Sequence, residues 1–263
     1  MPTFNDQLRN RIELDEIPKR IISIVPSQSE FLWDLGIREN LVGISKFCIH
    51  PSEMFRTIER VGGTKKLDLE KIRTLNPDLI IGNKEENSID DIVALQKEFR
   101  VWMSDITSLD DMYAMMNSLA LIFEKQKEGS LLVQKLEASL NRLKNVFQSE
   151  RVLYFIWKDP YMVAANGTFI NSVLQLLGLS NAAASRERYP VLTPELIQKL
   201  DPELCFLSGE PFPFREKHLN EFQTLLPKSK IVLVDGELFS WYGTRLLQLE
   251  GYIEDLVDKL HGG

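Results

Sequence analysis

The sequence predicts an α/β protein of two similar lobes, each built on a mostly parallel sheet, joined by a long rigid helix. Three observations predict this fold class. A helix followed by a strand occurs at matching places in both halves of the chain. The strands are continuously apolar, which is typical of parallel strands covered on both faces. Between the halves, apolar residues recur with the spacing of an amphipathic helix. A chain of 263 residues is long enough for two such lobes.

The strongest evidence is an internal repeat, which aligns residues 67–85 with residues 192–210 without a gap. Each copy opens with a short helix that ends before Pro77 or Pro202, because a proline disfavours helical geometry in the residue before it. An apolar strand follows in each copy. The repeat therefore predicts equivalent helix and strand pairs in the two lobes.

A second correspondence places a strand at the start of each half, at residues 20–25 and 151–156. Each strand leads into a helix, although the second copy carries an insertion at residues 161–168 that we interpret as a hairpin. Later strands at residues 101–103 and 231–234 close the two copies. Each half is therefore predicted to be a Rossmann-like α/β lobe with a mostly parallel sheet.

The segment between the lobes carries large apolar residues at helical spacing. They are Leu132, Leu136, Leu140, Leu143 and Phe147. Since no glycine-, serine- or proline-rich linker interrupts this segment, we expect a stiff backbone helix; the alternative is a core helix of one domain. The predicted domains are an N-terminal extension with a small hairpin (1–17), an N-terminal lobe (18–123), the interlobe helix (124–149) and a C-terminal lobe (150–263).

Composition and charge argue against several classes of protein. Hydrophobic residues make up 44% and charged residues 26% of the chain, and no apolar run is long enough to span a bilayer. The formal net charge is -7, with Lys and Arg scattered among acidic residues, so nucleic acid is not expected as a partner. Cys48 and Cys205 lie far apart and in different predicted lobes, which disfavours a structural disulfide.

The first residues of the sequence carry acid and amide side chains where a secretory signal needs a basic cluster and then an apolar run. Either an export signal is missing from the sequence as given, or the protein works in the cytoplasm. The sequence leaves both readings open.

Short motifs follow one another along the first third of the chain. They are PKRIISIVPSQSEFL at residues 18–32, LVGI at 41–44, VGGT at 61–64, LEKI at 69–72 and NPDLII at 76–81. In this order and spacing they resemble the periplasmic binding proteins for cobalamin and iron-siderophore complexes, also called helical-backbone metal receptors. The resemblance covers the chain from Thr3 to Leu260.

The resemblance implies a binding protein and not an enzyme. It implies that a metal chelate, either a corrinoid such as cobalamin or a ferric siderophore, is captured and delivered to the permease of an ABC importer. It also implies a periplasmic or cell-envelope location, a monomer and no intrinsic cofactor. The ligand is expected in the cleft between the lobes, at the carboxyl ends of the strands, where open α/β sheets bind their ligands.

Two glutamates are predicted to dock the protein on its permease. In the family, a glutamate at the start of one helix in each lobe pairs with arginines of the permease. The matching positions here are Glu70 and Glu195, which align with each other in the repeat. The alternative is that both carboxylates only complement the positive ends of helix dipoles.

A chelate with a broad apolar face needs aromatic side chains and a few polar groups in a concave site. The candidates near predicted loop ends are Phe47, His50, Trp157, Tyr161, Tyr189, Trp241 and Tyr242. Tyr189 matches a position where cobalamin binders of the family carry an aromatic that stacks on the ligand. Beside Gly62 and Gly63, where such a binder has its other aromatic, this chain has Thr64 and Lys65, so cobalamin itself stays open as the ligand.

The polar candidates each have two readings. The His50 imidazole either coordinates the chelated metal axially or hydrogen-bonds to backbone. The acidic residues after the matching strands, such as Glu85 and Glu210, either line the rim of the cleft or are solvated. No metal site made of side chains alone is expected, because the three histidines lack a paired spacing and the two cysteines are distant.

Two other functions remain as alternatives. An α/β enzyme is one, but the sequence has no phosphate-binding Gly-rich loop, nucleophile elbow or metalloprotease helix. A catalytic triad of Ser27, Asp105 and His50 can be written down, but nothing in the spacing of these residues requires it. No catalytic residue is therefore predicted. The other alternative is a cytoplasmic protein that stores, chaperones or senses a chelate without a permease.

Overall fold

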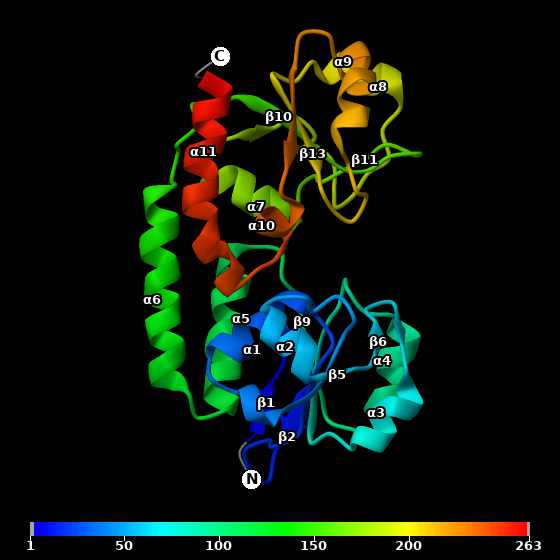
Figure 1. Ribbon diagram of the computed structural model, residues 1–263, viewed down its shortest axis with the longest axis vertical. Helices are drawn as coiled ribbons and strands as arrows, with labels where there is room; N and C mark the ends of the chain where they lie inside the picture. The colour runs from blue at the N-terminus through cyan, green and yellow to red at the C-terminus, as the bar shows by residue number, and fades with distance from the viewer. Residues whose placement is uncertain (1–2, 262–263) are drawn as a thin grey trace. The chain divides into compact units, whose positions relative to one another are not determined.

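The computed structural model describes residues 3–261, which form two compact units. Unit 1 takes the described residues up to Ile106 together with Asp110–Leu136 and Tyr242–Arg245. Unit 2 takes Thr107–Leu109, Glu137–Trp241 and the described residues from Leu246 onward. Both contain helices packed on a mostly parallel sheet, so the predicted α/β fold class is confirmed (Figure 1).

The sheet of unit 1 has the strand order β5-β4-β3-β8-β9, and neighbouring strands run parallel. In β3, β8 and β9 every residue is buried, as expected for strands covered on both faces. The strands are β3 (Ile21–Ser23), β4 (Leu41–Ile44), β5 (Glu59–Arg60), β8 (Leu79–Asn83) and β9 (Val101–Ser104).

Helices and two small hairpins complete unit 1. The predicted N-terminal hairpin is confirmed, because β1 (Thr3–Asn5) pairs antiparallel with β2 (Arg11–Glu13). A second hairpin pairs β6 (Gly62–Gly63) with β7 (Lys66–Leu67). The helices are α1 (Pro26–Asp34), the 3-10 helix η1 (Arg38–Asn40), α2 (Ser52–Thr57), α3 (Leu69–Leu75), α4 (Ile89–Gln96) and α5 (Leu109–Ile122).

The sheet of unit 2 is centred on β10 (Arg151–Trp157). On one side, β13 pairs parallel with β10, and β14 pairs parallel with β13. On the other side, β12 is parallel to β10, whereas β11 returns antiparallel to β10. The insertion at residues 161–168 therefore supplies one strand of a hairpin with β10 and does not form the predicted separate hairpin. The other strands are β11 (Met162–Val163), β12 (Ser180–Asn181), β13 (Leu204–Ser208) and β14 (Lys230–Val234). The helices are α7 (Phe169–Leu176), α8 (Pro194–Leu200), η2 (Glu216–His218), α9 (Leu219–Leu225), α10 (Gly236–Ser240), η3 (Thr244–Gln248) and α11 (Leu249–His261), with η3 beginning in unit 1.

The repeat seen in the sequence is confirmed residue by residue in the helix and strand pairs α3-β8 and α8-β13. Asp68 and Thr193 cap the two helices, each accepting a hydrogen bond from the backbone N–H three residues on. Asn76 and Asp201, each directly before a proline, end the helices in the left-handed conformation, with φ of 44° and 40°. The same local signals thus produce the same turn in both units.

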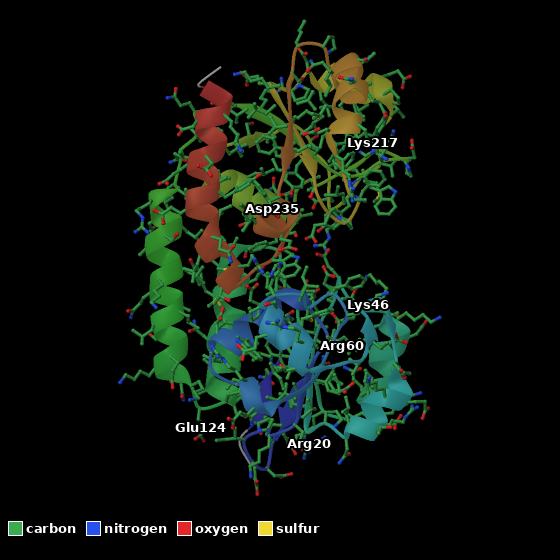
Figure 2. All side chains as sticks on the ribbon, viewed as in Figure 1. Arg20, Lys46, Arg60, Glu124, Lys217 and Asp235 are labelled. Carbon is green, nitrogen blue, oxygen red and sulfur yellow. The ribbon has the colours of Figure 1, made fainter. Side chains whose placement is uncertain are left out.

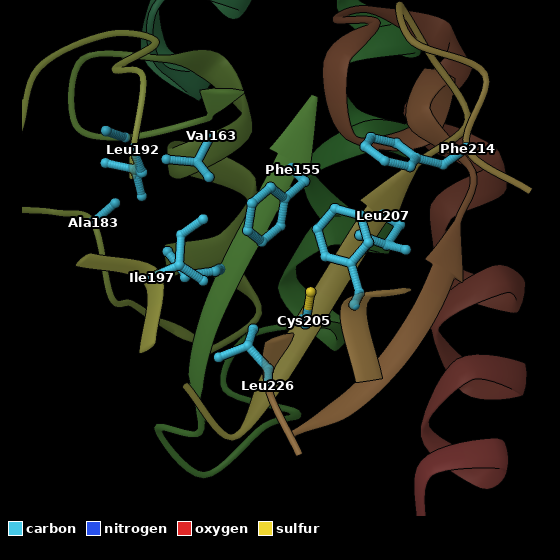
Figure 3. Packing of buried hydrophobic residues seen from close by; sticks show 12 residues of the cluster. Phe155, Val163, Ala183, Leu192, Ile197, Cys205, Leu207, Phe214 and Leu226 are labelled. Atoms are coloured by element: carbon cyan, nitrogen blue, oxygen red, sulfur yellow. The ribbon is translucent and has the colours of Figure 1, made fainter. Parts of the chain in front are cut away.

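The core of unit 2 shows why its strands are apolar without alternation. Phe155 on β10 packs edge to face against Phe222 of α9, with ring centroids 4.9 Å apart. Cys205 and Leu207 of β13 join the same cluster (Figure 3). On the opposite face, Tyr154 lies 5.3 Å from Phe239 of α10. Both faces of the sheet are therefore covered.

The predicted interlobe helix corresponds to α6 (Gln126–Arg142), which is shorter than the predicted segment. Its residues up to Leu136 belong to unit 1 and the rest to unit 2. Leu143 and Phe147 are buried, but they lie beyond the end of the helix. After the helix, Asn145 adopts a positive φ of 57° and its N–H bonds to Leu176 O of α7. Contacts with α7 therefore replace the helical hydrogen bonds that the apolar pattern predicted.

Among residues 3–261, no helix has the length and apolar character needed to cross a membrane.

Both cysteines are free and buried, Cys48 in unit 1 and Cys205 in unit 2. Burial raises the pKa of the Cys48 thiol to about 11 and also raises the pKa of Cys205. Because the thiolate is the reactive form, we expect the native protein to react with DTNB far more slowly than the protein in guanidinium. Absorbance of the released thiolate at mildly alkaline pH measures both rates. Prompt labelling of the native protein at either thiol would contradict this burial.

Candidate functional site

The carboxyl ends of the parallel strands are where an α/β sheet binds a ligand, next to the point where the strand order reverses. In unit 1 this point lies between β3 and β8, and in unit 2 between β10 and β13. The loops that follow these strands are therefore the candidate site of each unit.

A buried network of amides and hydroxyls lies under the candidate site of unit 1. The Gln28 side-chain NH2 near the start of α1 donates to Ser104 Oγ and, at 3.2 Å, to Tyr242 Oη. Asn83 Nδ2 at the end of β8 also donates to Ser104 Oγ, at 2.9 Å. Burial raises the pKa of the Tyr242 phenol, which keeps it neutral and able to donate. Tyr242, predicted to contact the ligand, is only 6% exposed and contributes its hydroxyl to this network.

Two asparagines shape the loop after β8. Asn83 Oδ1 accepts from the backbone N–H of Glu85 at 2.8 Å, and Asn87 Oδ1 accepts from the backbone N–H of Asn83 at 2.7 Å. Asn87 Nδ2 donates to Thr64 O at 3.1 Å, which ties this loop to the β6-β7 turn. Sequence reasoning missed both residues, although two asparagines four apart directly after an apolar strand are a usable signal for a side-chain-capped turn.

Phe47 lies at the carboxyl end of β4 and is 48% exposed. Lys46 Nζ lies 4.9 Å from the centroid of the Phe47 ring. A Cβ atom added to Gly63 would come within 3.3 Å of Phe47 Cε2 and 3.2 Å of Lys46 Cε, so both side chains pack against this glycine. His50 is partly exposed in the same β4-α2 connection. Phe47 therefore brings an aromatic ring to the β6-β7 turn, beside Thr64 and Lys65.

The candidate site of unit 2 carries an aromatic cluster. Trp157 ends β10 and is 38% exposed. Its ring meets Phe212 at 5.5 Å and an interplanar angle of 70°, and Phe212 lies 4.7 Å from Phe214. The backbone N–H of Phe212 bonds to Ile156 O at 3.3 Å, which fixes the loop after β13 against β10. Trp157, as predicted, lies at a strand end, but its aromatic partner Phe212 was not predicted.

Glu210 follows β13 and is held by two donors. Its Oε1 accepts from Ser240 Oγ at 2.8 Å and from Trp241 Nε1 at 2.9 Å. Trp241 is 8% exposed, so this predicted ligand aromatic is largely buried and directs its indole N–H at the carboxylate. Glu210 therefore has a defined orientation at the carboxyl end of the sheet.

Tyr161 and Tyr189 flank the hairpin strand β11. Tyr161 Oη donates to Glu221 Oε1 at 2.8 Å, and its ring lies 5.5 Å from Phe222. Burial, followed by the hydrogen bond to Glu221, raises the pKa of Tyr161 to about 12. Lys158 also pairs with Glu221, so Tyr161 belongs to an anchored group at the start of the hairpin. Tyr189 is partly exposed beside β11, where Val163 N bonds to Pro190 O at 3.2 Å.

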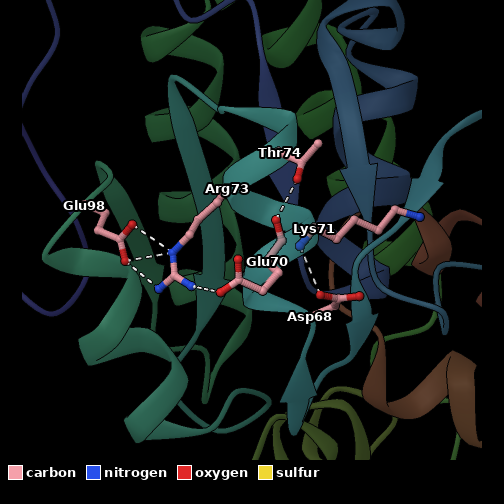
Figure 4. A network of polar contacts seen from close by, with 6 residues as sticks. All are labelled: Asp68, Glu70, Lys71, Arg73, Thr74 and Glu98. Carbon is pink, nitrogen blue, oxygen red and sulfur yellow. Dashed lines mark hydrogen bonds and ion pairs between the residues drawn. The ribbon is translucent and has the colours of Figure 1, made fainter.

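The two predicted docking glutamates have different surroundings. Glu70, with 85% of its side chain exposed, pairs with Arg73 one turn along α3 (Figure 4). Arg73 also holds Glu98, through Nη2 to Oε1 at 2.7 Å, and thereby keeps the pKa of Glu98 below its usual range. Glu195 has its pKa lowered by its own backbone N–H and by Thr193, as expected at a helix start. Both carboxylates are on exposed residues in the first turn of a short helix.

Within residues 3–261, no group of three or more His, Cys, Asp or Glu side chains is placed to hold a metal ion. The side chains that gather at the candidate sites are mainly aromatic rings, amides and hydroxyls, with the charged groups of Lys46 and Glu210 among them. This chemistry suits a bulky organic ligand with a broad apolar face.

Comparison with known proteins agrees with this geometry. A family model described as periplasmic binding protein matches residues 21–226. An uncharacterized ABC transporter substrate-binding lipoprotein of Bacillus subtilis is 25% identical over 98% of this chain and 85% of its own length. A vitamin B12-binding protein of Pectobacterium carotovorum is 23% identical over 88% of this chain and 85% of its own length.

The fold also matches solved structures. The crystal structure of the periplasmic vitamin B12 binding protein BtuF of Vibrio cholerae aligns with a TM-score of 0.77 and 24% identity. The alignment covers 90% of this chain and 95% of that one. Because the family model spans most of the chain, including the sheet of unit 1 and strands β10 to β13 of unit 2, the protein belongs to the periplasmic binding protein family.

Proposed function

We propose that this protein captures a metal chelate, either a corrinoid or a ferric siderophore, and delivers it to an ABC importer. The observation that carries the proposal is the pair of exposed aromatic side chains at carboxyl ends of parallel strands, Phe47 after β4 and Trp157 on β10. Each packs against fixed groups of its own unit, Phe47 on Gly63 and Trp157 on Phe212. Preorganised rings of this kind suit a planar or bulky apolar ligand face.

The polar side chains at the carboxyl ends of the strands of unit 1 favour ligand binding over catalysis. Asp105, which the sequence offered as part of a triad, is paired with Lys84 Nζ at 2.6 Å. Gln28, Asn83 and Asn87 use their amides to fix loops. The vitamin B12-binding relative supports a corrinoid-sized ligand. His50 remains a candidate axial ligand to a chelated metal in this proposal.

Docking on the permease is assigned to Glu70 and Glu195. Both are exposed and occupy the same position of the repeated helix. One relative is named a lipoprotein and another a periplasmic protein, which supports a location of this protein at the cell envelope. The protein is expected to act as a monomer there, since one copy carries both docking positions.

Tryptophan fluorescence tests the binding function. We expect cyanocobalamin or a ferric siderophore to quench the emission, because Trp157 is the exposed tryptophan at a candidate site. Replacement Trp157→Phe is expected to remove most of the quenching, whereas Trp33→Phe, at a buried site on α1, is expected to leave it. A panel of cobalamins and ferric siderophores that leaves the emission unchanged, with no heat of binding in calorimetry, would refute the proposal.

A further inference from the structure

A small surface of unit 1 carries a positive charge that the proposed function has not used. It consists of Lys46, Phe47, Gly63 and Lys65, and we call it the cationic platform. Lys46 and Phe47 follow β4, while Gly63 and Lys65 belong to the β6-β7 hairpin. Lys46 is exposed at the surface of the unit (Figure 2).

The platform is held together by packing and not by salt bridges. The Lys46 ammonium lies 4.9 Å from the centre of the Phe47 ring, within the range of a cation–π contact. The Lys46 stem and the Phe47 ring edge both abut Gly63, where a Cβ atom would crowd them at 3.2 and 3.3 Å. The ring and the ammonium therefore occupy defined places side by side.

The charge of Lys46 is not cancelled by an acid. Among residues 3–261, Lys46 makes no ion pair, and its contact is the face of Phe47. Lys65 donates to the backbone carbonyl of Glu85, and it also interacts electrostatically with Glu86. The charge of Lys65 is thus partly balanced, so the inference rests on Lys46.

Resting on the proposed function, we infer that the natural ligand is an anionic metal chelate, whose apolar face packs on Phe47 and whose carboxylate or phenolate group pairs with Lys46. A neutral chelate on Phe47 would cover the neighbouring ammonium and remove water from it without supplying a counter-charge, which is unfavourable. An anionic group replaces that water with a charge-assisted hydrogen bond. The platform therefore selects by charge among chelates of similar size.

Four probes test whether the charge of the chelate decides its affinity. Two are anionic: ferric hemin and a ferric tricatecholate siderophore. Two carry no net charge: a ferric trihydroxamate and cyanocobalamin. Calorimetry or fluorescence quenching gives the dissociation constant of each for the native protein, Lys46→Gln and Lys46→Glu. Lys66→Gln is the matched control, because Lys66 is an exposed lysine of the same hairpin but not part of the platform.

We expect an anionic probe to bind most tightly to the native protein. Lys46→Gln is expected to weaken that probe about tenfold and Lys46→Glu more, as for loss of one charge-assisted hydrogen bond. Neutral probes should change by less than about twofold, and Lys66→Gln should leave every constant unchanged. Raised salt should weaken the anionic probe more in the native protein than in Lys46→Gln.

Tighter binding of a neutral probe to the native protein, or an unchanged constant for the anionic probe in Lys46→Gln, would overturn the inference and leave the proposed function standing. Absence of binding by all four probes would overturn both.

Discussion

Reversing the charge of both proposed docking glutamates, Glu70→Lys with Glu195→Lys, is expected to abolish import of the chelate without changing its affinity for the protein. The two side chains sit at equivalent places of the repeat, each on an exposed helix start. Lysine at both positions would oppose cationic groups on a permease, and like charges across an interface cost several kcal/mol. Uptake of labelled chelate by the host lacking its own copy measures import, and calorimetry measures affinity.

Control variants and single variants sharpen this test. Glu53→Lys on α2 and Glu137→Lys on α6 make the same change of net charge at exposed sites elsewhere. These controls should import normally. Uptake that persists in the double variant would contradict docking and would show that both carboxylates only complement the positive ends of helix dipoles. Because Arg73 already pairs with Glu70, the single variant Glu195→Lys is expected to lose more uptake than Glu70→Lys.

Removing one partner of the buried ion pair between Glu30 and Arg245 is expected to cost about 3–5 kcal/mol of unfolding free energy. Arg245 Nε lies 3.0 Å from Glu30 Oε2, and the two side chains are only 7% and 10% exposed. Glu30→Ala would leave the guanidinium without this counter-ion in a site that water scarcely reaches. Urea unfolding of the native and variant proteins, followed by circular dichroism, measures the change.

An exposed pair and a double variant serve as controls. Glu13→Ala breaks the pair of Arg11 with Glu13, whose side chains are 69% and 51% exposed, and should cost no more than about 1 kcal/mol. Replacing both buried partners, as in Glu30→Leu with Arg245→Met, should recover much of the stability lost in Glu30→Ala. A cost for Glu30→Ala as small as that for Glu13→Ala would show that the buried pair contributes little.

The parts of the fold that depend on local signals were predictable from the sequence. The caps Asp68 and Thr193, the residues before Pro77 and Pro202, and the apolar strands are each set by neighbours in the chain. The equivalence of α3-β8 with α8-β13 followed from those signals alone. Exposure of Trp157 at the end of a strand was predictable in the same way.

The features that depend on distant contacts were not predictable. The end of α6 at Arg142 is decided by bonds from Asn145 to the end of α7, which the apolar spacing does not record. Trp241 and Tyr242 are adjacent in the chain, yet one belongs to unit 2 and donates to Glu210, while the other belongs to unit 1 and joins Gln28. No periodicity in a short segment reveals that the backbone changes unit between two neighbours.

Because of that change of unit, the first half of the polypeptide does not contain all of unit 1. A fragment stopped at Leu136 would contain most of unit 1 but would lack Tyr242–Arg245. It would expose the cavity left by Tyr242 and strand the Glu30 carboxylate without the guanidinium of Arg245. A single cut between the two halves of the chain therefore does not yield one complete unit in each fragment, even though the halves carry the same helix and strand repeat.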